Sequence, residues 1–386
     1  MTELEHPAPE GLPELHFRDA KAAARNLASL RPLVPEKVYE SLLALLPAAP
    51  DPDAVVNQFE RLAEAAWGNP PTAAFEASTA AATGRKNLAP TTAAIGAAMP
   101  ELLRLLEKHL SLVHYAVVVF GYSPWLGETL IHNPDLFYSF VRERRLDRTH
   151  SREELQEDFA RMRSRSFETD TAALLARFKR REYIRIMLRD VLGIATLAET
   201  TAEISALADV IIEEARREAN SLLQHRFGAP QRLDAEARVV DSRFAVLSLG
   251  KLGGNELNYS SDVDLLYLYE GGVEPEGAET SNREYFIRLA QHTTELLSRH
   301  TREGPVFRID LRLRPQGGEG EPAVPLAHAV YYYSQLAHDW ELQAMIKARH
   351  SAGDLGLARE FVRAVQPYVY RPEVNFVAIK TALETR

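Results

Sequence analysis

The chain has 386 residues and a formal net charge of −9, and this length suggests two or three domains. It contains no cysteine, which excludes disulfides, thiolate zinc sites and a cysteine nucleophile and is compatible with a reducing cytoplasm. The acidic balance argues against nonspecific binding to nucleic acid, which requires a basic face.

Neither the N-terminal segment nor the most apolar segment indicates a membrane protein. Residues 1–17 are acidic and proline-bearing, without the basic and apolar regions of a signal peptide. The most apolar stretch, Tyr115–Tyr122, is far shorter than the roughly 20 residues that span a bilayer. We therefore predict a buried helix segment there and no membrane association.

From about Phe17 to Arg232 the pattern is helical, because apolar residues recur at three- and four-residue spacing among Ala, Leu, Glu and Arg. Proline-containing breaks divide this region into several helices. They fall at Pro32, Pro35, 47–52, 69–71, Pro90 and 133–134. We predict an all-helical N-terminal region.

The pattern changes after residues 228–230. Arg243–Leu249 is short and apolar, as in a buried strand, and the glycine-rich segment Gly250–Gly254 follows as a turn. Asp262–Tyr269 opens with alternation and is rich in aromatic residues, which predicts a second strand.

Further along, Glu270–Ser281 is an acidic loop and Asn282–His300 an amphipathic helix. Val306–Arg314 alternates apolar and charged residues, which predicts a strand with one polar face. After a loop at 315–322, we expect helix from about Leu326 to the end. The predicted fold class is α+β and predominantly α-helical, with domains at 1–230, 231–330 and 331–386.

Three aspartates are the candidate catalytic residues. Asp262 and Asp264 are two apart on a strand, so both project from one face and can share a divalent cation. Mg²⁺ prefers such oxygen ligands together with substrate phosphates, and Asp310 on a neighbouring strand would complete a site for displacement at phosphorus. The alternative is a solvated strand edge, with Asp310 in a plain charge-alternating strand beside Arg308 and Arg312.

Phosphate binding is predicted near the same strands. Glycines let the backbone approach a phosphate and aim N–H groups at it, and serine hydroxyls and cationic side chains add donors. The candidate residues are Gly250, Lys251, Gly253, Gly254, Ser260, Ser261 and Arg312. The segment is not a P-loop, because Leu252 follows the lysine.

Three further residues lie on the helix predicted after this region. Lys347 and Arg349 are either phosphate ligands or members of surface salt bridges, and both alternatives stay open on the sequence. Trp340 is expected to be a core anchor.

Ser248–Glu270, SLGKLGGNELNYSSDVDLLYLYE, resembles the signature of the glutamine synthetase adenylyltransferase/adenylyl-removing family, a branch of the polymerase β-type nucleotidyltransferases. Other stretches resemble the same family in the same order. They are 177–193, Phe307–Gly317, His338–Asp354 and Tyr368–Phe376.

The resemblance implies a polymerase β-type unit in which Asp262, Asp264 and Asp310 bind Mg²⁺. Family members have two nucleotidyltransferase halves, and this chain resembles the N-terminal half, which removes AMP from an adenylylated tyrosine of glutamine synthetase by phosphorolysis to ADP. The chain stops at Arg386, where a family member would continue into a second half. The implied partners are glutamine synthetase, inorganic phosphate and ADP or ATP, with a PII-type signal protein as a further candidate.

Three alternatives stay open at this point. One is ATP-dependent adenylylation of glutamine synthetase, and another is a small-molecule or RNA nucleotidyltransferase of the same fold. The third is a low-turnover regulatory module that binds glutamine synthetase or a PII protein. The intact aspartates argue against a dead site, and the acidic composition argues against RNA.

Overall fold

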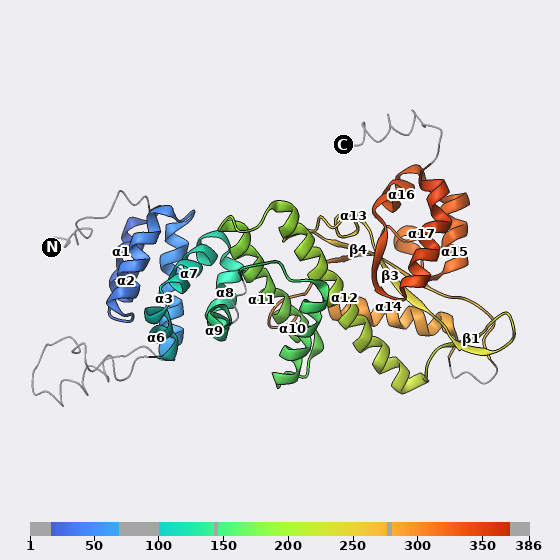
Figure 1. Ribbon diagram of the computed structural model, residues 1–386, viewed down its shortest axis with the longest axis horizontal. Helices are drawn as coiled ribbons and strands as arrows, with labels where there is room; N and C mark the ends of the chain where they lie inside the picture. The colour runs from blue at the N-terminus through green and yellow to red at the C-terminus, as the bar shows by residue number, and fades with distance from the viewer. Residues whose placement is uncertain (1–16, 69–99, 143–145, 276–279, 371–386) are drawn as a thin grey trace, which may run out of the picture. The chain divides into compact units, whose positions relative to one another are not determined.

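The computed structural model describes residues 17–68, 100–142, 146–275 and 280–370. The chain divides into two compact units (Figure 1). The first unit contains Met1–Arg148 and Tyr183–Ala195, and the second contains Thr149–Glu182 and Thr196–Arg386. Helix α11 (Thr171–Val191) runs from the second unit into the first.

The described part of the first unit is helical, as predicted. Its helices are α1 (Ala20–Leu30), α2 (Glu36–Leu45), η1 (Leu46–Ala48), α3 (Pro52–Trp67), α6 (Glu101–Lys108), α7 (Ser111–Tyr122), α8 (Pro124–His132) and α9 (Asp135–Arg142). The predicted apolar segment is the buried helix α7, whose Phe120 meets Phe59 of α3 edge to face. Helix α8 ends just before the predicted break at 133–134, whereas Pro90 lies outside the described residues.

Two capped helices begin the second unit beside α11. Both α10 (Arg152–Arg165) and α12 (Leu197–Phe227) start with a capping box, in which a Ser or Thr side chain and a Glu three residues later satisfy each other's backbone N–H groups. Helix α12 packs against helix α14 (Asn282–Ser298) and strand β7 (Arg349–Gly353). The sequence prediction placed α12 in a separate N-terminal region, and the predicted boundaries at 230 and 330 stay predictions.

The second unit contains a small mixed sheet. Its central strands are β3 (Phe244–Ser248) and β4 (Val263–Tyr269), which pair antiparallel, and β7 pairs antiparallel with the other edge of β3. Two short strands, β5 (Ile309–Asp310) and β6 (Ala323–Pro325), run parallel to β4 along its free edge. A hairpin of β1 (Gln231–Leu233) and β2 (Val239–Asp241) stands apart from this sheet.

Alternation along the strands gives the sheet two covered faces. On one face the ring of Phe286 in α14 stacks on Phe244 and Tyr269, with centroids 5.5 and 4.9 Å away. On the other face Leu247 and Leu266 belong to an apolar core shared with the C-terminal helices. Figure 1 shows the sheet between α14 and these helices. The predominantly helical α+β class is therefore confirmed.

The C-terminal part differs from the predicted continuous helix. It contains α15 (Leu326–Tyr331), the π-helical η3 (Tyr332–Leu336), α16 (Asp339–Ala344), η4 (Met345–Lys347) and α17 (Leu355–Val369). Strand β7 interrupts these helices, which makes the helix prediction wrong at residues 349–353. The sequence of this strand has no apolar run that would predict it. Its Arg349 and Ser351 are held instead by polar contacts with Asp209.

The predicted strand Val306–Arg314 is also too long. Only Ile309 and Asp310 pair with β4. The chain turns directly afterwards, because the Asp310 carboxylate accepts from the Arg312 backbone N–H at 2.8 Å and Arg314 N–H donates to the Leu311 carbonyl. Among the described residues, no helix is both long enough and apolar enough to cross a membrane.

We expect a fragment 232–386 to be insoluble or inactive. It lacks α12, so the faces of α14 and β7 that α12 covers would meet water. A fragment 149–386 retains α12 and should stay soluble. Expression of both, followed by gel filtration, is the measurement, and a soluble, active 232–386 fragment would show that the preceding helices are dispensable.

Candidate active site

Asp264 and Asp310 lie side by side on parallel strands. Their Cα atoms are partners in the β4–β5 register, so their side chains leave the same face of the sheet. Asp262 was predicted to open this strand, but it precedes the first residue of the observed β4 by one position. The structure thus brings the first two predicted carboxylates close to the third.

Arginines on the β5 segment hold the two outer carboxylates. The Nε of Arg308 lies 2.5 Å from Asp262 Oδ1. Arg312 donates to Asp310 from its Nε at 2.9 Å and from a terminal nitrogen at 2.5 Å. In this structure Arg312 is therefore a partner of a carboxylate, and its predicted role in phosphate binding stays a prediction.

The pKa values of Asp264 and Asp310 are shifted in opposite directions. Burial raises the pKa of the Asp264 carboxyl, and the charges of Asp310 and Asp262 raise it further. The hydrogen bonds from Arg312 instead lower the pKa of Asp310. Asp264 is thus the carboxylate whose negative charge is least compensated, and a cation beside it would relieve the repulsion.

The backbone of Gly250 lies close against the Asp264 carboxylate. Its φ is +55°, and a Cβ atom on it would lie 2.4 Å from Asp264 Oδ2. The Leu249 N–H donates to the Asp264 carbonyl at 3.0 Å, which fixes the start of the glycine segment to β4. Glycine is required here for both its conformational freedom and its missing side chain.

The rest of the glycine segment forms a short helical turn, α13 (Gly250–Gly253), where the sequence predicted an irregular turn. A Cβ on Gly253 would lie 2.2 Å from the Lys347 carbonyl oxygen, so this glycine allows the backbone of η4 to approach. At Gly254 the nearest atom would be Cδ of the Lys347 side chain, at 2.9 Å.

The other predicted phosphate-binding residues near this turn are the exposed Lys251 and Ser260 and the partly buried Ser261. Lys251 is exposed on α13. The Ser261 hydroxyl donates to Asn258 Oδ1 at 2.6 Å, and the Ser260 carbonyl accepts from Arg308 at 2.8 Å. These contacts shape the loop that leads into Asp262, and phosphate binding by the two serines stays a prediction.

The residues predicted as secondary candidates have partners of their own. Lys347 pairs with Glu256 at 2.6 Å on the surface, and Arg349 pairs with Asp209 at 2.6 Å in the interior. Lys347 thus has the surface salt bridge of the alternative, whereas the Arg349 pair is largely buried, and phosphate binding by either residue stays a prediction. Trp340 is 55% exposed, so the prediction that it anchors the core is wrong.

A second group of possible metal ligands lies away from the three aspartates in the chain. Among the described residues, oxygen and nitrogen atoms of His150, Asp158 and Glu182 lie within 4.8 Å of one another. Arg161 already pairs with Asp158, and Arg181 lies 2.9 Å from Glu182. This group is an ion-pair network whose carboxylates have cationic partners, and sequence reasoning did not find it because its members are dispersed along the chain.

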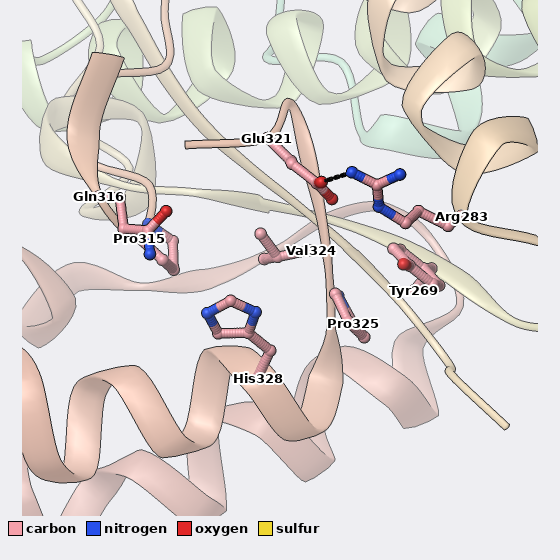
Figure 2. A pocket seen from close by; sticks show the side chains of 8 residues that line it. All are labelled: Tyr269, Arg283, Pro315, Gln316, Glu321, Val324, Pro325 and His328. Carbon is pink, nitrogen blue, oxygen red and sulfur yellow. Dashed lines mark hydrogen bonds and ion pairs between the residues drawn. The ribbon is translucent and has the colours of Figure 1, made fainter. Parts of the chain in front are cut away.

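A cavity of about 300 Å³ lies beside Tyr269, the last residue of β4 (Figure 2). Its wall includes Tyr269, Pro325 and His328, and Arg283 pairs with Glu321 at its side. Tyr269 is five residues beyond Asp264, about 16 Å along a strand. The lining also includes Pro315 and Gln316 but none of the three aspartates.

Comparison with known proteins identifies the family. Residues 113–364 match the family model described as glutamate-ammonia ligase adenylyltransferase. The chain is similar to bifunctional glutamine synthetase adenylyltransferase/adenylyl-removing enzymes of Hahella chejuensis (34% identity), Thioalkalivibrio sulfidiphilus (36%) and Pseudomonas aeruginosa (37%). These alignments cover 68%, 72% and 68% of this chain but only 27%, 30% and 27% of the relatives. The chain belongs to the glutamate-ammonia ligase adenylyltransferase family and spans less than a third of these relatives' length.

We expect Asp264→Asn to lower turnover at least about 100-fold without loss of stability. The folded-state pKa of Asp264 is raised, so its ionised form opposes folding at neutral pH, and the amide removes this cost. The melting temperature at pH 7 without Mg²⁺ should be unchanged or higher, and the difference should shrink as pH falls into the carboxyl range.

Two variants serve as comparisons for that experiment. Asp262→Asn should also abolish turnover. Asp310→Asn should lower the melting temperature at pH 7, because the folded-state pKa of Asp310 is lowered and its charge stabilises the fold. Retained activity in Asp262→Asn or Asp264→Asn would refute the metal assignment.

Gly250→Ala should be more harmful than Gly254→Ala. The first places a Cβ against Asp264 at a φ of +55°, a conformation that costs a non-glycine residue about 1–2 kcal/mol. The second has ordinary φ and meets only the flexible side chains of Lys347 and Glu256. Denaturant unfolding and turnover of both variants test this, and equal effects would contradict it.

Proposed function

We propose that this chain is a Mg²⁺-dependent nucleotidyltransferase that acts on glutamine synthetase and removes AMP from an adenylyl-tyrosine by phosphorolysis, giving ADP. The observation that carries the proposal is the register of Asp264 with Asp310 beside Gly250. A paired carboxylate site next to a close-approach glycine suits chemistry at a phosphate. The names of the relatives supply glutamine synthetase as the protein substrate.

The uncompensated charge at Asp264 supports a cation at this position. Asp262, Asp264 and Asp310 would hold it, with Arg308 and Arg312 giving up part of their pairing. Mg²⁺ there would neutralise negative charge on the phosphoryl oxygens and align the attacking and leaving groups.

The chain's own groups have simple tasks in this reaction. Inorganic phosphate is already anionic at neutral pH, so the attacking oxygen needs no strong base, and Asp310 is better used as a ligand than as a base. The exposed Lys251 offers a positive charge to hold phosphate at the glycine turn. An oxygen of inorganic phosphate bonds to the adenylyl phosphorus as the bond from that phosphorus to the tyrosine oxygen breaks, which gives ADP. The tyrosine leaves as a phenolate with an ordinary pKa of about 10, so a nearby cation or donor is needed to stabilise it.

The direction of the reaction rests on the resemblance to the N-terminal half of the family. ATP-dependent adenylylation is the second candidate, since the relatives are named for both activities. A regulatory module that binds glutamine synthetase or a PII protein is the third. Intact carboxylates and the close fit at Gly250 favour turnover over this third candidate.

Incubation with adenylylated glutamine synthetase, Mg²⁺ and inorganic phosphate should release ADP, and omission of phosphate should stop the reaction. ATP with unmodified glutamine synthetase should give little product. Radiolabelled adenylyl groups followed by chromatography distinguish the outcomes. Release of AMP in place of ADP would show hydrolysis, and efficient transfer from ATP would show that the direction was assigned wrongly.

A further inference from the structure

Helix α12 carries three buried polar residues on one face. Ser205, Asp209 and Glu213 are spaced by four, which aligns them along the helix, and their exposed fractions are 0%, 4% and 7%. All three bond to the nucleotidyltransferase core of the second unit. The stripe explains why α12 packs with the sheet and not only with other helices.

Asp209 is the centre of the stripe. Its Oδ2 lies 2.6 Å from a terminal nitrogen of Arg349, and its Oδ1 accepts from the Ser351 hydroxyl at 2.5 Å. Arg152 approaches the same carboxylate at 3.8 Å. A buried carboxylate with these partners is fixed in place, because losing one of them would leave an uncompensated charge.

Both main partners of Asp209 continue to the glycine turn. Arg349 donates to the Leu252 carbonyl from Nε at 3.2 Å and from a terminal nitrogen at 3.0 Å. The Ser351 hydroxyl is also hydrogen-bonded to the hydroxyl of Ser248, the last residue of β3. The Asp209 carboxylate is therefore linked to the turn at two points. Ser351 connects it to Ser248, just before the turn, and Arg349 connects it to Leu252 within the turn.

The other two residues of the stripe provide a comparison. Ser205 accepts from the Leu257 N–H at 3.1 Å, just beyond the turn. Glu213 accepts from the Gly353 N–H at 2.9 Å and pairs with Arg216 at 2.8 Å. Gly353 is at the opposite end of β7 from Arg349, so Glu213 is equally buried but does not contact the turn.

We propose that Asp209, through Arg349 and Ser351, is a positioning residue that fixes the turn Gly250–Gly254 against Asp264. Its relevance to catalysis rests on the proposed phosphate-binding function of that turn. A segment with glycines at three of its five positions is conformationally free, so contacts from outside must hold it. Displacement by about 1 Å is enough to lower a rate strongly.

The test compares Asp209→Asn with Glu213→Gln in the full chain. Hydrogen exchange of residues 249–257, measured by mass spectrometry, should become at least about tenfold faster in Asp209→Asn and stay within about twofold of wild type in Glu213→Gln. Calorimetry with ADP and Mg²⁺ should show about tenfold weaker binding in Asp209→Asn and unchanged binding in Glu213→Gln. Arg349→Lys keeps the charge but loses the two donors to Leu252, so it should resemble Asp209→Asn.

Equal effects of Asp209→Asn and Glu213→Gln, or unchanged exchange at the turn in Asp209→Asn, would overturn the proposal. If Asp209→Asn does not fold, Ser351→Ala replaces it, since it removes only the hydroxyl link and should still speed exchange at the turn. Failure of the wild-type chain to bind ADP with Mg²⁺ would count against the proposed function alone, because the exchange comparison decides the positioning role by itself.

Discussion

The carboxylates of Asp262, Asp264 and Asp310 repel one another, and the surrounding structure holds them together against this repulsion. A parallel register that puts Asp264 beside Asp310 is electrostatically unfavourable, and Arg308 and Arg312 compensate only the outer two. Apolar layers packed on both faces of β3 and β4 hold these strands in place. A site that concentrates negative charge in this way needs a stiff scaffold more than it needs a deep pocket.

The sequence predicted the elements whose residues follow a simple apolar pattern. Strands β3 and β4 and helix α14 were expected nearly where they lie, and the first unit was expected to be helical without bounds for each helix, because an apolar pattern marks these elements. The sequence also predicted that Asp310 would lie on a strand next to Asp264, and the two are register partners. Their roles as ligands stay predictions.

The parts that could not be predicted depend on polar contacts. Strand β7 reads as RHSAG and carries no apolar alternation, because its place beside β3 is secured by Asp209, about 140 residues earlier. Strand β5 ends early because Asp310 bonds the backbone of Arg312. Trp340 was predicted to be buried because it is large and apolar. It is exposed, since an apolar residue on a short helix can lie on the side that faces solvent.

The pairing of Ser248 with Arg349 in the sheet has a consequence for the order of folding. Strands β3 and β4 are close in sequence and can pair early, but the glycine turn between them receives its outside support only when a strand about a hundred residues later arrives. Contacts of such long separation form slowly. During synthesis we therefore expect a period in which Asp264 is already on a paired strand while the turn is still loose, so that the fit of Gly250 against Asp264 is completed last.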